Sequence, residues 1–230
     1  MDDKIFRRVE KKYLLTQKQY ERLIKRLIIY LEKDTFFEST ICNIYFDTKD
    51  DDLIIKSIEK PLFKEKIRLR SYNTPKMNST VFFEIKNKYK GIVGKRRVNL
   101  ALNDFYKYLE TGVFGENNQI MREIDYHFHH YKVYPKLFLA YDRQSYKGKD
   151  DNNFRVTFDS NLRSRRSDLR LEIGSQGNLY FDEPHYIMEV KTLSTLPLWF
   201  TKVLAELKIY PKSFSKYGSI YKKESELNAR

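Results

Sequence analysis

The chain has 230 residues, 41% of them hydrophobic, and a formal net charge of +13. This length and apolar share indicate one folded domain with a sizeable core and exclude a disordered chain. The single cysteine excludes an internal disulfide framework, and no run of residues approaches the roughly 18 apolar residues expected of a membrane-spanning helix.

Predicted strands and helices follow one another along most of the chain. Strand-like alternation covers 5–15, and Thr16 with Gln19 three residues later forms a capping-box pattern that begins a helix over 17–33. The further predicted elements are strands at 40–48, 61–72, 80–90, 92–100, 135–147, 153–160, 168–174 and 185–193, helices at 103–110, 117–131 and 198–207, and a short helix or loop at 50–58. This order indicates an α+β fold around an antiparallel sheet or closed barrel, in one domain over 1–222 with a frayed tail over 223–230.

Charged residues repeat at every second position in several of these strands, so each strand carries them on one face. In KEKIRLR at 64–70, four cations share a face. The same period recurs elsewhere, in Arg8, Glu10 and Lys12, in Glu84, Lys86 and Lys88, in Lys95 and Arg97, in Arg155 and Asp159, and in Glu189 and Lys191. Two layouts fit this pattern. Either the apolar faces form a core with the charges outside, or the strands close into a barrel whose charged faces line a water-filled lumen under outer helices.

The cations concentrate in one part of the sequence. Residues 53–100 contain thirteen Lys and Arg against three Glu, so a polyanion is the expected partner. Nucleic acid, an acidic membrane and polyphosphate all match this charge. A lumen lined by Lys and Arg would bind phosphate oxygens, and its few carboxylates could hold a divalent metal.

Seven stretches form a further set of motifs: YFDTKDDDLI at 45–54, RLRSY at 68–72, FFEIK at 82–86, AYDRQSY at 140–146, FRVTFDSNL at 154–162, YIMEVK at 186–191 and SFSKYGSIY at 213–221. The first resembles a signature of the CYTH-like triphosphate tunnel metalloenzymes. The other six resemble, within that superfamily, the VTC domain, the polyphosphate polymerase module of the vacuolar transporter chaperone. The resemblance covers about residues 6 to 221. It implies a closed, antiparallel, eight-stranded β-barrel that forms a triphosphate tunnel, with helices packed on the outside.

The resemblance also implies roles for individual residues. Those implied to bind phosphate are Lys12, Arg68, Arg70, Lys86, Lys95, Arg97, Tyr141, Arg143, Arg155, Lys191, Ser215 and Lys216, where spacing alone does not choose between Lys95 and Arg97. Arg68, Arg70, Lys216 and Glu189 are the expected catalytic residues. Glu189 is the implied ligand of Mn²⁺ or Mg²⁺, and Glu10 or Glu84 is a candidate second metal ligand.

The implied activity is transfer of the γ-phosphate of ATP, or of another nucleoside triphosphate, to a growing polyphosphate chain. Arg8 stands where hydrolytic relatives keep a glutamate, which favours this polymerase over a triphosphatase acting on inorganic or nucleoside triphosphates. A non-catalytic module that binds polyphosphate, triphosphate or pyrophosphate is the other alternative. Few aromatic residues accompany the basic strands, so nucleic acid is not the expected partner. We expect a cytoplasmic protein that does not insert into a membrane, although a membrane partner is compatible with it.

Four shorter patterns have competing interpretations. Glu189-x-Lys191 also matches the E-x-K of nucleases, with Asp159 or Glu172 as second carboxylate, and the S-x-x-K at 213–216 is a chance match. The histidines of YHFHHY at 126–131 have no acidic or Cys partner placed beside them, which favours a surface role over a metal site. The basic run at 163–170 is either a solvated edge or a surface that gathers polyphosphate or nucleic acid.

Overall fold

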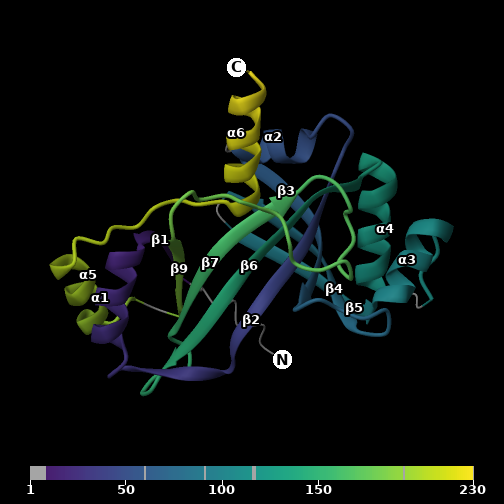
Figure 1. The fold of residues 1–230 in the computed structure, drawn as a ribbon. Helices are drawn as coiled ribbons and strands as arrows, with labels where there is room; N and C mark the ends of the chain where they lie inside the picture. Colours follow the sequence, from purple (N-terminus) through teal and green to yellow (C-terminus); the bar gives the residue numbers. More distant parts are fainter. Residues whose placement is uncertain (1–8, 60, 91, 116–117, 194, 230) are drawn as a thin grey trace. The chain divides into compact units, whose positions relative to one another are not determined.

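The computed structural model describes residues 9–59, 61–90, 92–115, 118–193 and 195–229 and shows an α+β fold (Figure 1). The strands are β1 (Val9–Thr16), β2 (Leu31–Asp47), β3 (Phe63–Tyr72), β4 (Thr80–Tyr89), β5 (Ile92–Ala101), β6 (Tyr134–Gly148), β7 (Arg155–Arg165), β8 (Asn178–Leu179) and β9 (His185–Thr192). The helices are α1 (Gln17–Leu27), α2 (Asp52–Ile58), α3 (Leu102–Thr111), α4 (Gln119–Tyr131), α5 (Leu198–Glu206) and α6 (Lys216–Asn228). In the described chain, no helix has the length and apolar character needed to cross a membrane.

The strands belong to one sheet with the order β1-β9-β7-β6-β2-β3-β4-β5, and β8 pairs with β7 off this path. The pairings from β1 to β9 and from β2 through β5 are antiparallel, as the sequence predicts. The order ends at β1 and β5, and no pairing among the described residues joins these two strands. The predicted closure into a barrel is therefore not observed. A two-residue period determines which side chains share a face, but it does not determine whether the end strands pair.

The chain forms two compact units. Unit 1 contains Met1–Ser39, Tyr141–Leu162 and Phe181–Ser215, and unit 2 contains Thr40–Ala140, Arg163–Tyr180 and Lys216–Arg230. The strands β2, β6 and β7 each contribute residues to both units. Each unit has its own apolar core.

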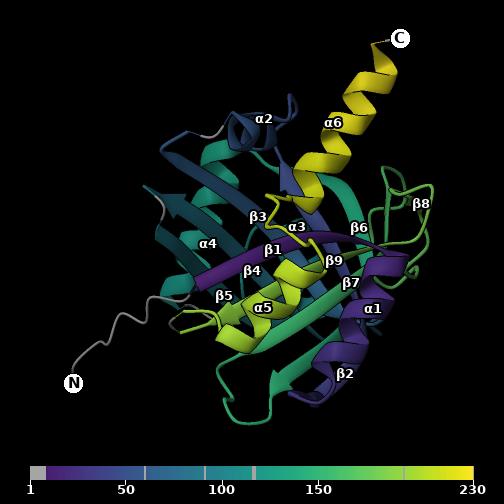
Figure 2. The same cartoon turned by 90° about the vertical axis from the view of Figure 1, so that its left-hand side faces the viewer.

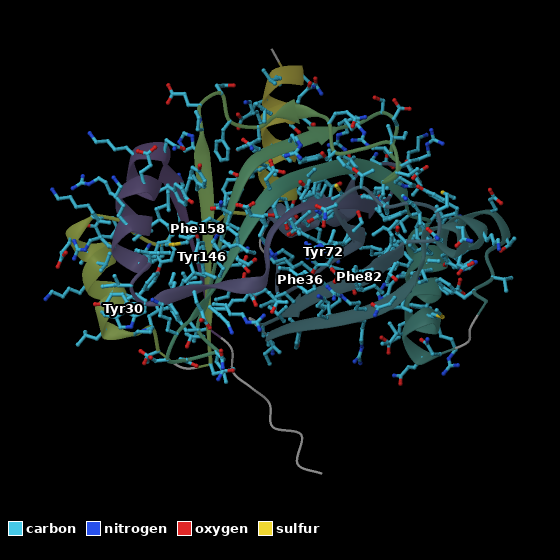
Figure 3. All side chains as sticks on the ribbon, turned by 60° about the horizontal axis from the view of Figure 1, so that its bottom comes forward. Tyr30, Phe36, Tyr72, Phe82, Tyr146 and Phe158 are labelled. Carbon is cyan, nitrogen blue, oxygen red and sulfur yellow. The ribbon has the colours of Figure 1, made fainter. Side chains whose placement is uncertain are left out.

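In unit 1, α1 and α5 lie beside each other near β1 and β9 (Figures 1 and 2). The α1 helix begins as predicted, because Thr16 and Gln19 form a complete capping box. The core behind these helices includes Leu23, Phe200 and Phe158, all fully or almost fully buried. Phe158 packs edge-on against Tyr146 at 5.9 Å (Figure 3).

In unit 2, α3 and α4 lie next to each other beside β4 and β5 (Figure 1). Their apolar side chains pack with those of one face of β3, β4 and β5. The buried members of this core include Ile67, Leu69, Phe83, Ile85, Val98, Phe105 and Ile124. The even-numbered residues of β3 and β4 thus lie on the opposite face, which no residue of this core occupies.

Three element predictions are wrong. The helix predicted over 17–33 ends at Leu27, because Leu31, an apolar residue at helical spacing, is instead the buried first residue of β2. Residues 168–174 form a loop, not a strand. The segment 223–228, expected to fray, is helical as the end of α6. The first residues of the predicted strand at 5–15, with Arg8, lie outside the described residues.

Candidate functional site

The polar face of β3, β4 and β5 in unit 2 carries a dense array of cations, which we call the cation ladder. It consists of Lys64, Lys66, Arg68, Arg70, Lys86, Lys88, Lys95 and Arg97. The antiparallel register places these residues in rows across the three strands: Lys64 with Lys88, then Lys66, Lys86 and Lys95, then Arg68, Glu84 and Arg97, and finally Arg70 with Phe82. Eight cations therefore share this described face with a single carboxylate, that of Glu84.

Repulsion within the ladder is substantial. Neighbouring strands lie about 5 Å apart, so two like charges in one row repel by about 0.8 kcal/mol in water and by about 3 kcal/mol at an effective dielectric near 20. The second row, of Lys66, Lys86 and Lys95, has no carboxylate of its own, and Lys95 reaches Glu84 of the next row at 2.8 Å. A bound polyanion would remove this repulsion, which is the electrostatic property expected of a phosphate-binding surface.

Glu84 is the counter-ion of three cations at the centre of the ladder. Its side chain is fully buried and accepts hydrogen bonds from Arg68 Nε at 2.7 Å and Arg97 Nε at 2.6 Å, and it contacts Lys95 Nζ at 2.8 Å. Burial opposes its ionisation, but Arg68, Arg70 and Lys95 hold the pKa of Glu84 well below its usual value. Both Lys95 and Arg97 thus lie at the ladder. The three cations around Glu84 make it a structural counter-ion here rather than an open metal ligand.

Aromatic and amide groups fix the other end of the ladder. Arg70 donates from Nε to Asn43 Oδ1 at 2.9 Å, and its side chain is buried. The guanidinium of Arg97 lies 4.5 Å above the ring of Phe82, which packs edge-on against Tyr72 (Figure 3). These contacts restrict the arginine side chains before any ligand binds.

Tyr45 connects the ladder to the start of α6. It faces Arg68 across the β2–β3 pair, its hydroxyl lies 3.5 Å from Arg68 Nη1, and its ring lies 4.8 Å from the ring of Tyr217. Tyr217 donates to Asp47 Oδ2 at 3.2 Å. Because Tyr217 directly follows Lys216, these contacts place the predicted catalytic lysine at the N-terminus of a helix anchored beside the ladder.

Asp47 is the buried anchor of this arrangement. Its carboxylate accepts from the backbone N–H groups of Thr48, Leu53 and Ile54 at 2.9, 2.8 and 2.9 Å, and also from Tyr217. It therefore caps the N-terminal end of α2 and holds α6 with the same group. Asp47 and Tyr45 belong to the YFDT stretch that carries the family resemblance.

The cations of the ladder act on the phenol of Tyr45. Burial raises its pKa, but Arg68, Lys66 and Arg70 together lower the pKa of Tyr45 to about 8, from an ordinary value of 10.0. The folded state thus favours the tyrosinate. The stability gained from this group is fully present above the ordinary pKa and is lost as the pH falls through about 8.

We predict that triphosphate binding weakens as the pH rises through about 8, because the tyrosinate adds a negative charge beside Arg68. Isothermal titration with inorganic triphosphate across this range would measure the effect, with Tyr45→Phe as the matched variant. Burial also lowers the pKa of Lys95, but this lysine is present in both wild type and Tyr45→Phe, so it changes the pH dependence of binding equally in the two. Identical pH profiles for wild type and Tyr45→Phe would contradict the prediction.

The polar face of unit 1 contains a second group of predicted site residues, which we call the Glu189 cluster. In the register of β1, β9 and β7, Lys12, Glu189 and Thr157 form one row, and Glu10, Lys191 and Arg155 form the next. Glu189 contacts Lys191 Nζ at 2.5 Å and Lys12 Nζ at 3.6 Å. Acids and bases alternate here, in contrast to the cation ladder.

Arg143 also belongs to unit 1, and an ion pair fixes its side chain. It forms a two-pronged ion pair with Asp159, with Nε to Oδ1 at 2.6 Å and Nη2 to Oδ2 at 2.8 Å. Its guanidinium also lies 5.3 Å from the ring of Tyr141. Arg155 is more exposed and lies 3.8 Å from Asp34. The pairing of Asp159 with Arg143 removes this carboxylate as the second acid of a nuclease site.

The oxygen atoms around Glu189 are of the kind that a divalent cation binds, although Lys12 and Lys191 already contact its carboxylate. Thr157 Oγ1 is buried and has no hydrogen-bond partner in the described structure, although it stands directly opposite Glu189. Glu10 supplies another carboxylate diagonally across the register. Hard cations such as Mg²⁺ bind through one or two carboxylates plus substrate phosphates, so a complete protein cage is not required. Among the described residues, no group of three or more His, Cys, Asp or Glu side chains is arranged to hold a metal.

The segment before α6 begins at the Glu189 cluster. The backbone N–H of Lys212 donates to the carbonyl of Lys12 at 2.8 Å, and the side chains of Lys212, Ser213 and Ser215 are exposed. Ser215 is the last residue of unit 1, and Lys216 begins the third segment of unit 2. The structure thus assigns Lys12, Glu189 and Ser215 to one unit and Arg68, Arg70 and Lys216 to the other.

The basic run at 163–170 has a structural role that the sequence did not suggest. Arg165 donates to four carbonyls, those of Asp168, Arg170, Gly174 and Gln176, at 2.7–3.1 Å, and lies 3.5 Å from the ring of Phe138. Arg163 donates to the carbonyl of Ser175. These bonds organise the loop in place of the predicted strand at 168–174, because its carbonyls bond to arginine instead of to a neighbouring strand.

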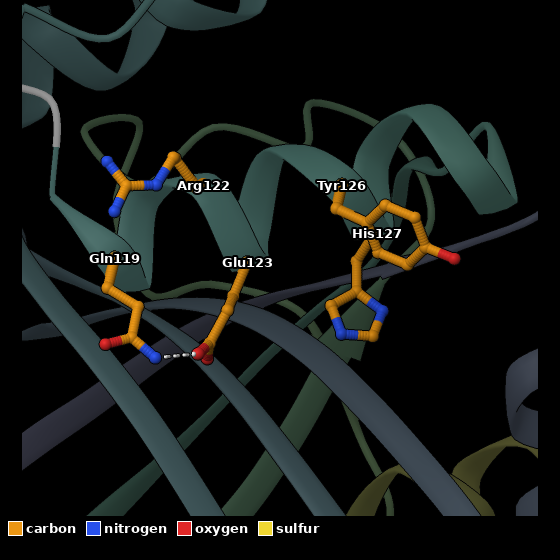
Figure 4. Close-up of a pocket in the computed structure, with 5 residues that line it drawn as sticks. All are labelled: Gln119, Arg122, Glu123, Tyr126 and His127. Carbon is orange, nitrogen blue, oxygen red and sulfur yellow. Dashed lines mark hydrogen bonds between the residues drawn. The ribbon is translucent and has the colours of Figure 1, made fainter.

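The histidines of α4 lie away from the cation ladder, on the helix-covered side of unit 2. His127 Nε2 is 3.6 Å from Glu65, which also accepts from Tyr131 at 2.9 Å. A cavity of about 300 Å³ beside them is lined by Gln119, Arg122, Glu123, Tyr126 and His127 (Figure 4). Glu123 accepts from Gln119 at 3.0 Å within it. The expectation that no acidic residue lies beside these histidines is wrong, because His127 lies near Glu65 and His129 Nδ1 is 3.3 Å from Asp125.

Solved structures that share this fold include one from Bacillus halodurans and one from Vibrio parahaemolyticus. A protein from Bacillus halodurans, provisionally assigned as an adenylate cyclase, has a TM-score of 0.56 at 16% identity, covering 90% of this chain and 92% of its own. A protein from Vibrio parahaemolyticus with the same provisional assignment has a TM-score of 0.51 at 11% identity, covering 93% and 97%. No curated protein matches the chain.

The comparison with protein families identifies the chain more specifically than its fold does. The VTC domain matches residues 7–224, and the chain therefore belongs to the VTC domain family. The resemblance seen in the sequence motifs is confirmed.

Proposed function

We propose that the protein is a phosphotransferase of the polyphosphate polymerase type, which moves the γ-phosphate of ATP or another nucleoside triphosphate to a polyphosphate chain. The observation that carries the proposal is the cation ladder, where eight cations share a face with one carboxylate. Membership of the VTC domain family supports the choice of phosphate chain as the polyanion. A tunnel for the phosphate chain, as the family resemblance implies, is part of this proposal, as is the cytoplasm as the place of action.

In this mechanism the arginines position phosphate groups and neutralise charge. Arg68, Arg70 and Arg97 donate to non-bridging oxygens, while Lys66, Lys86 and Lys95 extend the positive field along the chain. A terminal oxygen of the polyphosphate attacks the γ-phosphorus, the bond from that phosphorus to the β–γ bridging oxygen breaks, and ADP leaves. No protein nucleophile is required, because phosphoryl transfer depends mainly on positioning and charge.

Residues of the Glu189 cluster would hold a Mn²⁺ or Mg²⁺ ion. Glu189 and Thr157 would supply oxygens, with Glu10 as the candidate second carboxylate. The ion would neutralise charge on the transferring phosphate. Lys12, Lys191, Tyr141, Arg143 and Arg155 would bind phosphate nearby, and Ser215 and Lys216 would bind it at the start of α6.

One observation favours a triphosphatase instead. Glu10 and Glu189 offer two carboxylates on one polar face, which suits activation of a water molecule. The products distinguish the two activities, since hydrolysis releases free phosphate and polymerisation yields long chains.

The test is an assay of purified protein with Mn²⁺ or Mg²⁺ and γ-labelled ATP, resolving long polyphosphate from free phosphate. We expect Arg70→Ala and Glu189→Ala to reduce polymer formation by about 10²-fold or more. Matched controls are Arg96→Ala, whose side chain pairs with Glu123 away from the ladder, and Glu206→Ala, which pairs with Arg26. Absence of both products, or unchanged activity in both site variants, would contradict the proposal.

A further inference from the structure

One end of the three-stranded part of unit 2 is unusually apolar. Leu62, Phe63, Tyr89, Ile92 and Val93 are all exposed there, with 69% of Leu62 and 75% of Ile92 accessible to solvent. We call these five residues the apolar tip. The register brings them together: Phe63 pairs with Tyr89, Tyr89 pairs with Ile92, and the N–H of Lys90 donates to the carbonyl of Leu62 at 2.9 Å.

Lysines surround the apolar tip. Lys64 and Lys88 occupy the next row, and Lys90 lies beside Tyr89 with Nζ 5.4 Å from its ring. One row further, Lys66, Lys86 and Lys95 add three more cations. Glu65 lies between Lys64 and Lys66 in the sequence, but its carboxylate points to the opposite face of the sheet, where it is buried against Tyr131. The tip thus combines exposed apolar side chains with a positive border.

We infer that the apolar tip docks on the surface of an anionic phospholipid bilayer. Exposed apolar groups gain free energy by entering the region between headgroups and acyl chains, and nearby lysines are attracted to anionic headgroups. A protein partner fits less well, because the apolar residues form the ends of strands rather than a broad face or groove, and the charged residues in the neighbouring rows of the ladder are lysines. This docking requires no membrane-spanning helix, and it would bring one end of the cation ladder to the membrane surface.

The experiment measures co-sedimentation of the full chain with vesicles of phosphatidylcholine alone or mixed with phosphatidylglycerol. We expect wild type to bind the anionic vesicles in low salt and to bind the neutral ones at least about tenfold more weakly. The double variant Ile92→Ser with Val93→Ser should lose more than about tenfold in binding, because two apolar side chains no longer enter the bilayer. Val113→Ser is the matched control, since Val113 is 69% exposed on the same unit and should bind like wild type.

A second measurement tests insertion directly. Cys42 is fully buried, so an environment-sensitive dye attached to Ile92→Cys reports on the tip alone. We expect its emission to shift to the blue on anionic vesicles, and that of dye on Val113→Cys to stay unchanged. Equal binding of wild type and the double variant, equal binding to both lipids, or an unshifted dye would each overturn the inference. So would a concentration-dependent dimer, seen by ultracentrifugation, that the double variant abolishes, because the tip would then contact a second copy.

Discussion

Replacing Glu84 by glutamine should lower the free energy of unfolding by about 3–5 kcal/mol, because it removes the only carboxylate on the described face of the ladder. Arg68, Lys95 and Arg97 would then face one another without a counter-ion. Denaturant unfolding at low salt would measure this loss. Glu123→Gln is the matched control, since its partner Arg96 is mainly exposed and such pairs contribute only about 0–1 kcal/mol.

The same substitution should strengthen anion binding. Without Glu84, the ladder has one negative charge fewer to compete with a phosphate chain, so inorganic triphosphate should stabilise Glu84→Gln more than wild type in thermal melts. A variant that melts like the Glu123→Gln control would contradict the structural role of Glu84. A variant that is destabilised but gains nothing from triphosphate would show that the ladder does not bind this ligand.

Replacing Asp47 by asparagine should cost about 3 kcal/mol of stability, the second large effect that we expect. The carboxylate accepts from four donors, and an amide would point an N–H₂ group at one pair of them. Circular dichroism melts would measure the loss. Asp52→Asn, the same change at the exposed start of α2, should cost less than about 1 kcal/mol.

Tyr217→Phe separates the two roles of Asp47. This variant keeps the cap of α2 and removes only the hydrogen bond to α6, so we expect about 1 kcal/mol of destabilisation. The assay of phosphoryl transfer uses a temperature at which the variant is fully folded, so its lower stability does not affect the rate. If the bond positions Lys216, the rate of transfer should still fall. Unchanged transfer would mean that the bond has a purely structural role.

The faces of the strands could be predicted from the sequence, and so could the residues on them. The alternation in KEKIRLR places Lys64, Lys66, Arg68 and Arg70 on one face, and the structure confirms that arrangement. The rows could not be predicted, because they depend on the register between the three strands. The two-residue period of the side chains does not determine that register. For that reason spacing could not choose between Lys95 and Arg97, whereas the structure brings both to Glu84.

Helix α6 could not be predicted from the sequence, for a different reason. Its residues carry only a weak apolar pattern, so local propensity gives little indication of a helix. The helix is fixed instead by Tyr217, which bonds to a carboxylate 170 positions earlier in the chain. Asp47 and Tyr45 were visible in the sequence only as members of the YFDT motif. Their roles depend on contacts that no local pattern encodes.

The excess of cations over carboxylates in the ladder also has a consequence for selectivity inside a cell. Such a face attracts every abundant polyanion, including nucleotides, inorganic phosphate and RNA, so it is rarely empty. Charge alone therefore cannot choose the ligand, and selection must come from the difference in affinity between competitors. The rows repeat about every 7 Å along the strands, which favours a flexible chain of regularly spaced charges over a compact anion that reaches only one row. Occupancy would then depend on ligand length as much as on concentration.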